Sequence, residues 1–186
     1  DGEPKLDAAA GAVFFTATEK DPRERHLYRV SLKGKGFARL TFDKGTHQAI
    51  ASPDGRFVLD TWSNVDTPPR VVLGRADGKV ARVVFAPKSA LDEYLLATTE
   101  MGSFTGSDGT LFYTRLVKPA DFDPSKRYPV VVYVYGGPHA QVVQERWGGP
   151  SPFDQVLAST GFLVWEMDNQ AAGRSAITLV VTSNRF

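Results

Sequence analysis

Short stretches of alternating apolar and polar residues recur about every ten residues through the first half of the chain. They predict strands over residues 13–19, 26–32, 38–42, 47–51, 57–64, 70–75 and 79–85. Turn residues such as Ser52-Pro-Asp-Gly55 separate these strands, which favours antiparallel, all-β structure. Similar starts near Gly11 and Thr46 indicate a repeat of propeller-blade length, and this part of the chain is expected to hold fewer than two blades.

The pattern changes after Lys88. Residues 97–119 predict a hairpin turned at Ser107-Asp-Gly109, because Asp-Gly between apolar runs favours a tight turn. A strand ending at Tyr135, a helix near residues 153–160 and a strand over 162–168 follow. The two strands are expected to be parallel, and the strand before Tyr135 to be buried on both faces. The predicted fold is a β-propeller segment (all-β) over residues 1–90, followed by the N-terminal part of an α/β-hydrolase domain over residues 91–186.

Composition excludes several classes of function. Lys and Arg total 22 against 21 for Asp and Glu, with no basic stripe, so no nucleic-acid partner is expected. The absence of cysteine excludes disulfides, thiol nucleophiles and cysteine zinc sites. No apolar stretch approaches the roughly 20 residues of a membrane span. We expect a globular protein with neither a cofactor nor a metal site.

Tyr135 is the candidate for chemistry, because an apolar strand delivers its phenol to a Gly-Gly-Pro turn. At the carboxyl end of a parallel strand, a hydroxyl is well placed to donate to an oxyanion, together with a backbone N–H. The alternative is an aromatic side chain that caps the sheet, and the sequence leaves both open. Gly136 and Gly137 would serve the conformation of the turn first and contact the substrate second.

Three further residues are candidates for substrate binding. Asp168 follows the second buried strand, where it either contacts the substrate or closes a turn on its own backbone. Arg146 and Trp147 either line a substrate cleft or, in the case of the tryptophan, anchor the packing of a Gly-rich loop.

Other polar residues have simpler explanations. His139 has no nucleophile-elbow serine to activate. Asp121 and Asp123 could form a calcium site, but their loop favours plain turn chemistry. His26 and His47 are expected at the surface or in cross-strand pairs.

Together these residues resemble the dipeptidyl peptidase IV branch of the prolyl oligopeptidase family of serine peptidases. The likeness spans nearly the whole chain. It is carried by Glu24-Arg-His-Leu-Tyr28, Ser52-Pro-Asp-Gly55, Gly106-Ser-Asp-Gly109, Lys118-Pro119 and, most specifically, Tyr135-Gly-Gly-Pro-His139. The resemblance implies a propeller that covers an α/β-hydrolase domain and a serine-type peptidase that cleaves peptides near the N-terminus by acyl transfer. It also implies that Tyr135 donates to the tetrahedral oxyanion.

The chain also departs from that family. The Gly-x-Ser-x-Gly nucleophile and the later Asp and His are absent, Asp168-Asn-Gln-Ala171 replaces an Asp-x-Arg-Gly turn, and residues 175–186 do not resemble the expected helix. We therefore expect a fragment that lacks the nucleophile. The alternatives are a catalytically inactive propeller-hydrolase piece that acts as a binding or assembly module, and a sugar- or peptide-binding propeller unrelated to hydrolases. Exposed strand edges leave a homo-oligomer open, and the resemblance favours a periplasmic or secreted location.

Overall fold

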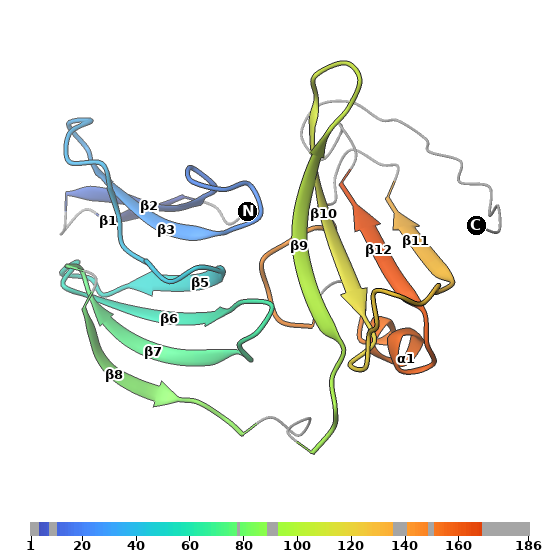
Figure 1. Cartoon of the computed structure of the whole chain (residues 1–186). Coiled ribbons are helices and arrows are strands. Elements are labelled where there is room, and N and C mark those ends of the chain that lie inside the picture. Colours follow the sequence, from blue (N-terminus) through green and yellow to red (C-terminus); the bar gives the residue numbers. More distant parts are fainter. Residues whose placement is uncertain are drawn as a thin grey trace. The chain divides into compact units, whose positions relative to one another are not determined.

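A computed structural model describes residues 4–7, 11–77, 79–88, 93–135, 141–148 and 151–168 (Figure 1). Contacts divide the chain into two units. The first unit is Asp1–Ser89 with Gln144–Trp147, and the second is Ala90–Val143 with Gly148–Phe186. The division falls beside the predicted boundary after residue 90. It differs from the prediction in that Gln144–Trp147 belong with the first unit.

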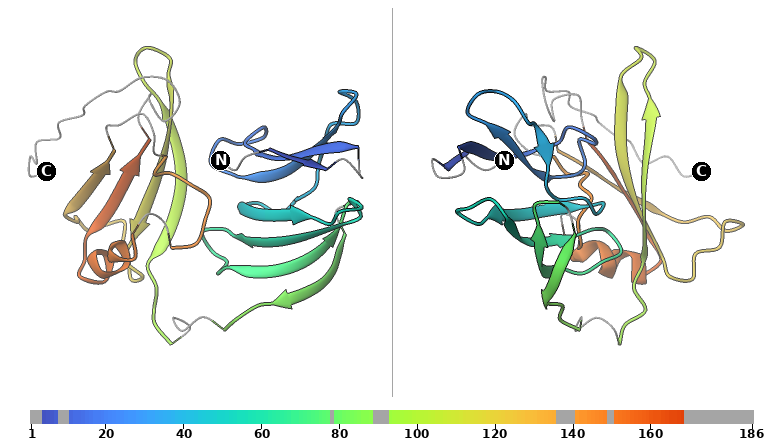
Figure 2. Two further views of the ribbon diagram at one scale, coloured as in Figure 1. Left: turned by 180° about the vertical axis from the view of Figure 1, so that it is seen from behind. Right: turned by 90° about the vertical axis from the view of Figure 1, so that its left-hand side faces the viewer.

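The first unit contains two four-stranded antiparallel sheets, each in sequence order. The first sheet comprises β1 (Lys5–Asp7), β2 (Ala12–Ala17), β3 (His26–Ser31) and β4 (Ala38–Arg39). The second comprises β5 (Thr46–Ala51), β6 (Phe57–Ser63), β7 (Arg70–Arg75) and β8 (Val80–Phe85). Two successive four-stranded meanders are the architecture of propeller blades, and Figure 2 shows both sheets from two further sides.

The expectation of fewer than two blades is wrong. The three-residue strand β1 pairs with β2 and completes the first sheet. A strand this short carries too few residues for alternation to be recognised in the sequence.

The core of the first unit lies where the two sheets face each other. Five buried residues form it, Ala12, Phe14, Leu27, Leu40 and Val58. They come from strands of both sheets and from the chain after β4, so the sheets are joined by apolar contact as well as by the chain between them.

The turn into β5 requires glycine. Gly45 has a φ of +144°, and a Cβ atom there would lie 2.3 Å from the carbonyl oxygen of Ser63. This close approach of backbone to backbone sets the start of β5 beside the end of β6.

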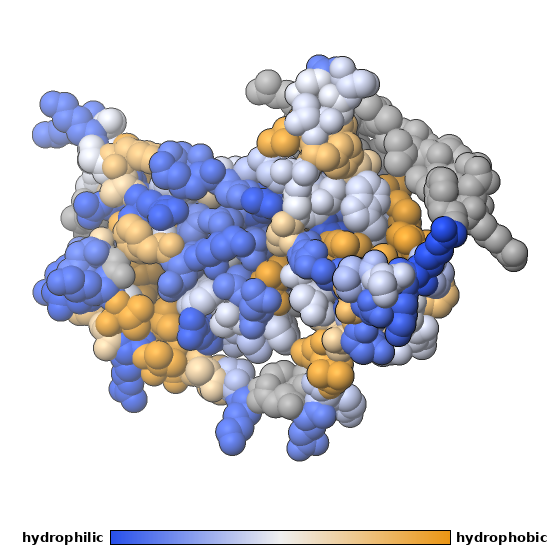
Figure 3. Space-filling model, viewed as in Figure 1, coloured by the Kyte–Doolittle hydropathy of each residue, from blue (hydrophilic) through white to orange (hydrophobic). Residues whose placement is uncertain are grey.

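The last strand of the second sheet is exposed along its whole length. All six residues of β8 are exposed, and four of them, Val80, Val83, Val84 and Phe85, are large and apolar. Figure 3 shows apolar surface at the lower left of the view, in the region where Figure 1 places this sheet. Among the described strands β8 pairs with β7 alone, so its outer edge offers both backbone hydrogen-bonding groups and apolar side chains.

The second unit is a mixed four-stranded sheet in the order β11-β12-β10-β9. Its elements are β9 (Thr98–Thr105), β10 (Leu111–Lys118), β11 (Val130–Val134), α1 (Phe153–Ser159) and β12 (Leu163–Met167). β9 and β10 form the predicted hairpin, in which Gly109 takes a φ of +85°. β11 and β12 pair in parallel, as predicted from the crossover rule.

Helix α1 lies against β10 and β12 (Figures 1 and 2). Val117, Ala158 and Val164 form the buried cluster between the helix and the sheet. The Ser151 hydroxyl accepts a hydrogen bond from the N–H of Phe153 at 3.1 Å, and Gly161 follows the helix with a φ of +90°. No helix in the described part of the chain has the length and apolarity needed to cross a membrane.

The expectation that the strand before Tyr135 is buried on both faces is wrong. Among the described strands β11 has one neighbour, β12, and stands at the edge of the sheet. Val130 is 52% exposed and Tyr133 is 48% exposed. An apolar run signals burial in the assembled sheet, and it does not distinguish an edge strand from a central one.

Candidate functional site

Tyr135 stands at the carboxyl end of a parallel strand. It directly follows β11, and the last pair in register between the two parallel strands is Val134 and Met167. The residue is 39% exposed. An exposed phenol that follows a parallel strand occupies the position at which open α/β sheets bind ligands. Gly136, Gly137 and His139 lie outside the described residues.

Asp168 follows β12 and is therefore next to Tyr135 in the order of the sheet. Its side chain is buried, and its N–H donates to the carbonyl of Tyr113 at 3.2 Å. Its Oδ1 accepts hydrogen bonds from the backbone N–H groups of Val142 at 2.7 Å and Val143 at 3.1 Å. This carboxylate oxygen thus holds the backbone of Val142 and Val143, near the start of the described segment 141–148.

Three buried charged residues of the second unit form a network that joins β10, β12 and helix α1. The Nη1 of Arg115 on β10 donates to Oε2 of Glu166 on β12 at 2.8 Å and to Oδ2 of Asp154 on α1 at 3.0 Å. All three residues are buried. Burial raises the pKa of Glu166 to about 7, against the lowering effect of Arg115 and with a further increase from Asp154. One guanidinium contacts two carboxylates here, and the raised pKa means that Glu166 is about half protonated near pH 7.

The sequence pattern did not predict this network. The available signal was a charged residue at an inward position within an apolar strand, since Arg115 and Glu166 face each other across β10 and β12. The third member, Asp154, comes from the helix and has no such signal.

The remaining predicted site residues belong to the first unit. Arg146 is exposed and Trp147 is partly buried. The backbone N–H of Trp147 donates to Oγ of Ser63 at 3.3 Å. Arg146 and Trp147 are thus described with the propeller-like sheets, whereas Tyr135 and Asp168 belong to the second unit.

Glu145 anchors this segment within the first unit. Its N–H donates to the carbonyl of Arg23 at 2.8 Å, and its carbonyl accepts from the Thr46 hydroxyl at 3.0 Å. Its side chain is 1% exposed and pairs with Nζ of Lys44 at 3.0 Å. These two hydrogen bonds to the main chain of Glu145 and its ion pair with Lys44 together hold residues 144–147 in place within the first unit.

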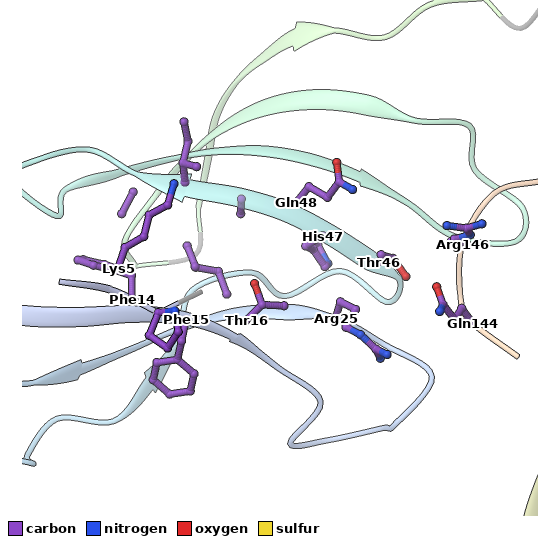
Figure 4. A pocket seen from close by; sticks show the side chains of 15 residues that line it. Lys5, Phe14, Phe15, Thr16, Arg25, Thr46, His47, Gln48, Gln144 and Arg146 are labelled. Atoms are coloured by element: carbon purple, nitrogen blue, oxygen red, sulfur yellow. The ribbon is translucent and has the colours of Figure 1, made fainter. Parts of the chain in front are cut away.

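A pocket of about 590 Å³ lies in the first unit between β2, β5 and the segment 144–147 (Figure 4). Among the described residues that line it, Lys5, Arg25 and Arg146 are cationic and none is acidic. Figure 4 shows Lys5 toward one end and Arg146 toward the other. Phe14 and Ile50 are among the apolar residues of the lining.

Two buried histidines meet between the sheets of the first unit. His26 is 0% exposed and His47 is 3% exposed, so the surface alternative is wrong. The cross-strand alternative holds for His47, which lies opposite Trp62 in register and stacks on its ring with the centroids 5.9 Å apart. Their ring centroids lie 4.7 Å apart. A parallel bridge between Arg25 and Thr46, the residues just before them, brings the two side chains together.

Hydrogen bonds occupy all four ring nitrogens of this pair. His47 Nδ1 lies 2.6 Å from Oδ2 of Asp60, and its Nε2 lies 2.8 Å from the carbonyl oxygen of Asp43. His26 Nε2 lies 2.8 Å from Oε2 of Glu24, and its Nδ1 lies 3.1 Å from the Thr41 hydroxyl. Burial lowers the pKa of His26, with hydrogen bonding to Glu24 acting in the opposite direction.

The described residues contain no cluster of three or more His, Cys, Asp or Glu side chains that could hold a metal ion. The carboxylate of Asp123 instead accepts hydrogen bonds from the hydroxyl of Ser125 at 2.7 Å and from its N–H at 2.9 Å. These bonds hold the pKa of Asp123 below its ordinary value, and they are the turn chemistry that its loop predicted.

The chain is similar in sequence to proteins named as dipeptidyl peptidases. A family profile described as the dipeptidyl peptidase IV (DPP IV) N-terminal region matches residues 4–69. Human dipeptidyl peptidase 8 is 30% identical over 180 residues, and dipeptidyl-aminopeptidase B of Aspergillus niger is 29% identical over 192 residues. These matches cover 90% and 94% of this chain.

A solved structure shows the same likeness. The crystal structure of Porphyromonas gingivalis dipeptidyl peptidase 4 superposes with a TM-score of 0.73 at 30% sequence identity. The match covers 90% of this chain and 25% of that protein. The chain spans about a fifth of the length of the curated relatives, since the two matches above cover 20% of each.

Proposed function

The chain belongs to the dipeptidyl peptidase IV family over the segment it spans, and we propose that it forms part of a serine-type dipeptidyl peptidase. The reaction would be transfer of a peptide acyl group to a serine and then to water, which releases dipeptides from the N-terminus of a peptide substrate. The 186 residues contain no Gly-x-Ser-x-Gly sequence, so the proposal assigns the serine, Asp and His to residues outside this chain.

The position of Tyr135 supports this proposal. It follows a strand that pairs in parallel with β12, and its side chain is partly exposed. In the proposed reaction its hydroxyl donates to the oxyanion that forms when the serine attacks the scissile carbonyl. Arg146 and Trp147 remain candidates for substrate binding, as do Gly136 and Gly137.

Replacement of Tyr135 by phenylalanine in the full-length enzyme tests the role. Removing one oxyanion donor costs about 10²–10³ in kcat, so Tyr135→Phe should lower kcat on a dipeptidyl substrate by about 10² or more. KM should change little, because the lost interaction forms in the transition state.

Tyr133→Phe is the matched control. Tyr133 lies two residues earlier on β11 and is 48% exposed, so this change removes a phenol from the same strand. We expect an activity close to that of the wild type. An unchanged kcat in Tyr135→Phe, or an equal fall in both variants, would contradict the assigned role.

A binding or assembly module is the second candidate function. It is favoured by the missing nucleophile sequence and by the strands β8 and β11, each of which has one neighbour among the described strands. A fluorophosphonate probe separates the two, because it should label the full-length enzyme and leave the 186-residue chain unlabelled. Light scattering of the same chain would show whether its edges cause self-association. The third alternative, a propeller unrelated to hydrolases, loses support because β11 and β12 are parallel.

A further inference from the structure

The two buried histidines come from different sheets of the first unit. His26 lies on β3 of the first sheet and His47 on β5 of the second, and their ring centroids are 4.7 Å apart. Main-chain hydrogen bonds join the sheets at the same place. The N–H of His47 donates to the carbonyl of Arg25 at 3.0 Å, and the N–H of Arg25 donates to the carbonyl of Gly45 at 3.2 Å. The charges of the two rings therefore act where the sheets meet.

The hydrogen-bond partners of His47 require a proton on each ring nitrogen. Its Nε2 lies 2.8 Å from the carbonyl oxygen of Asp43, which can only accept, so Nε2 carries a hydrogen. Its Nδ1 lies 2.6 Å from Oδ2 of Asp60, and imidazole is a stronger base than a carboxylate, which assigns the proton between them to the ring. The imidazolium so formed stacks on Trp62, and the guanidinium carbon of Arg70 lies 4.2 Å from the centroid of that indole.

The partners of His26 are those of a neutral ring. Its Nε2 lies 2.8 Å from Oε2 of Glu24, to which an N–H can donate. Its Nδ1 lies 3.1 Å from Oγ1 of Thr41, and the same oxygen accepts from the N–H of Leu27 at 3.0 Å. The Thr41 hydroxyl can therefore donate its own hydrogen to a bare Nδ1. A proton on Nδ1 would abolish this bond and require the hydroxyl to accept from both neighbours.

The surroundings of His26 oppose a second proton on its ring. Burial is the largest of the effects that lower its pKa, and the charges of His47 and Arg39 act in the same direction. Hydrogen bonding to Glu24 and the charge of that carboxylate act in the opposite direction. The neutral state that the hydrogen bonds indicate is therefore also the state that the nearby charges favour.

We propose that the contact between His26 and His47 is a pH-sensitive switch that controls how firmly the two sheets of the first unit hold together. At neutral pH Asp60 keeps His47 charged, and His26 is neutral. When His26 takes up a proton, two imidazolium rings lie side by side in a buried contact, and the bond from Thr41 is lost. Like charges at this separation repel each other, so acid opens the contact. The switch is independent of the peptidase reaction.

Nitrogen-15 NMR of the 186-residue chain tests the two charge states, because the chain contains three histidines. Single substitutions by glutamine assign the ring signals of His26, His47 and His139. At pH 7 we expect two protonated nitrogens in His47, and one protonated and one bare nitrogen in His26. A bare nitrogen in His47, or two protonated nitrogens in His26, would overturn the assignment and the switch with it.

Amide hydrogen exchange measures the opening itself. The N–H of His47 donates across the two sheets, so its protection reports on their contact. Because the pKa of His26 is lowered, the open state binds more protons than the closed one and gains on it below the ordinary histidine value of about 6.5. Between pH 7.5 and pH 5.5 the protection of this N–H should fall about tenfold more than that of the β6–β7 ladder. His26→Gln should remove the difference, and an equal fall at both places in the wild type would contradict the switch.

Two amide variants test the coupling between the rings. Asp60→Asn can donate an N–H to Nδ1 of His47, so this ring can give up its charge, and the pH at which His26 takes up a proton should rise by about one unit. Glu24→Gln removes the carboxylate that favours a charged His26 and should move the same pH downward. A fall or no change in Asp60→Asn would overturn the proposal, since it would mean that His47 carries no charge. Should Asp60→Asn fail to fold, the ring signals of the wild type still decide.

Discussion

Replacing Glu166 by glutamine should make the second unit more stable at alkaline pH and leave its stability nearly unchanged at acid pH. Glu166 is 1% exposed and shares one Arg115 nitrogen with Asp154, so its ionised form has little solvent and only part of a counter-charge. Glutamine has the same shape, is neutral at every pH, and keeps an oxygen that can accept from Arg115.

The magnitude follows from the pKa. Burial raises the pKa of Glu166 from 4.5 to about 7, so the folded state keeps a proton that the unfolded state has already lost. The free energy of unfolding of the wild type therefore falls as the pH rises from about 4.5 to about 7. The interval corresponds to about 3 kcal/mol at 1.36 kcal/mol per pH unit. Between pH 5 and pH 8 the advantage of Glu166→Gln over the wild type should grow by about 2–3 kcal/mol.

Urea unfolding followed by fluorine NMR of fluorotryptophan-labelled protein measures this difference. Trp165 lies beside Glu166 on β12 and reports on the second unit, while Trp62 and Trp147 belong to the first. Glu100→Gln on β9 is the matched control, because its side chain is 54% exposed in its pair with Lys118. It should show no such growth.

A Glu166→Gln variant that is destabilised equally at pH 5 and pH 8 would refute the reasoning. That result would mean that Arg115 fully compensates the ionised glutamate.

Two further variants probe the buried charges of each unit. Arg115→Met leaves two buried carboxylates without their cation, so the Trp165 signal should show a loss of about 3–5 kcal/mol at pH 8 and a smaller loss at pH 5, where Glu166 is protonated; a loss below about 1 kcal/mol would contradict this. In the first unit the pKa of His26 is lowered, so the folded state binds fewer protons than the unfolded state and its stability should fall as the pH drops below about 6.5. His26→Gln should flatten this dependence in the Trp62 signal, and an unchanged slope would count against it.

Local patterns predicted most of the strands, because turns and alternation depend on neighbouring residues. The Asp-Gly turn at residue 109 and the parallel pairing of β11 with β12 are both present. β1 escaped prediction because three residues are too few for a pattern. The exposure of β11 could not be predicted either, since an apolar strand looks the same at the edge and in the centre of a sheet.

In the candidate site, too, the features that depend on local sequence could be predicted, and the contacts between distant residues could not. The location of Tyr135 after β11 followed from an apolar run and from the Gly-Gly-Pro sequence that succeeds it, and both are local sequence patterns. The contacts of Asp168 with Val142 and the meeting of His26 with His47 join residues that are distant in sequence or lie on different sheets. Periodicity within one segment carries no information about such partners.

The anchoring of Glu145 has a consequence for the order of events during translation. Glu145 is synthesised about 55 residues after Ser89, the end of the first part of this unit. Its contact residues all lie in that earlier part, namely Arg23, Lys44 and Thr46. At a synthesis rate of about 5–20 residues per second, the contacts of Glu145 can form only several seconds after the residues up to Ser89 have been synthesised. During that interval Lys44 lacks its ion pair with Glu145, and the two sheets are joined by their apolar contacts, by the bridge between Arg25 and Thr46 and by the His26–His47 pair.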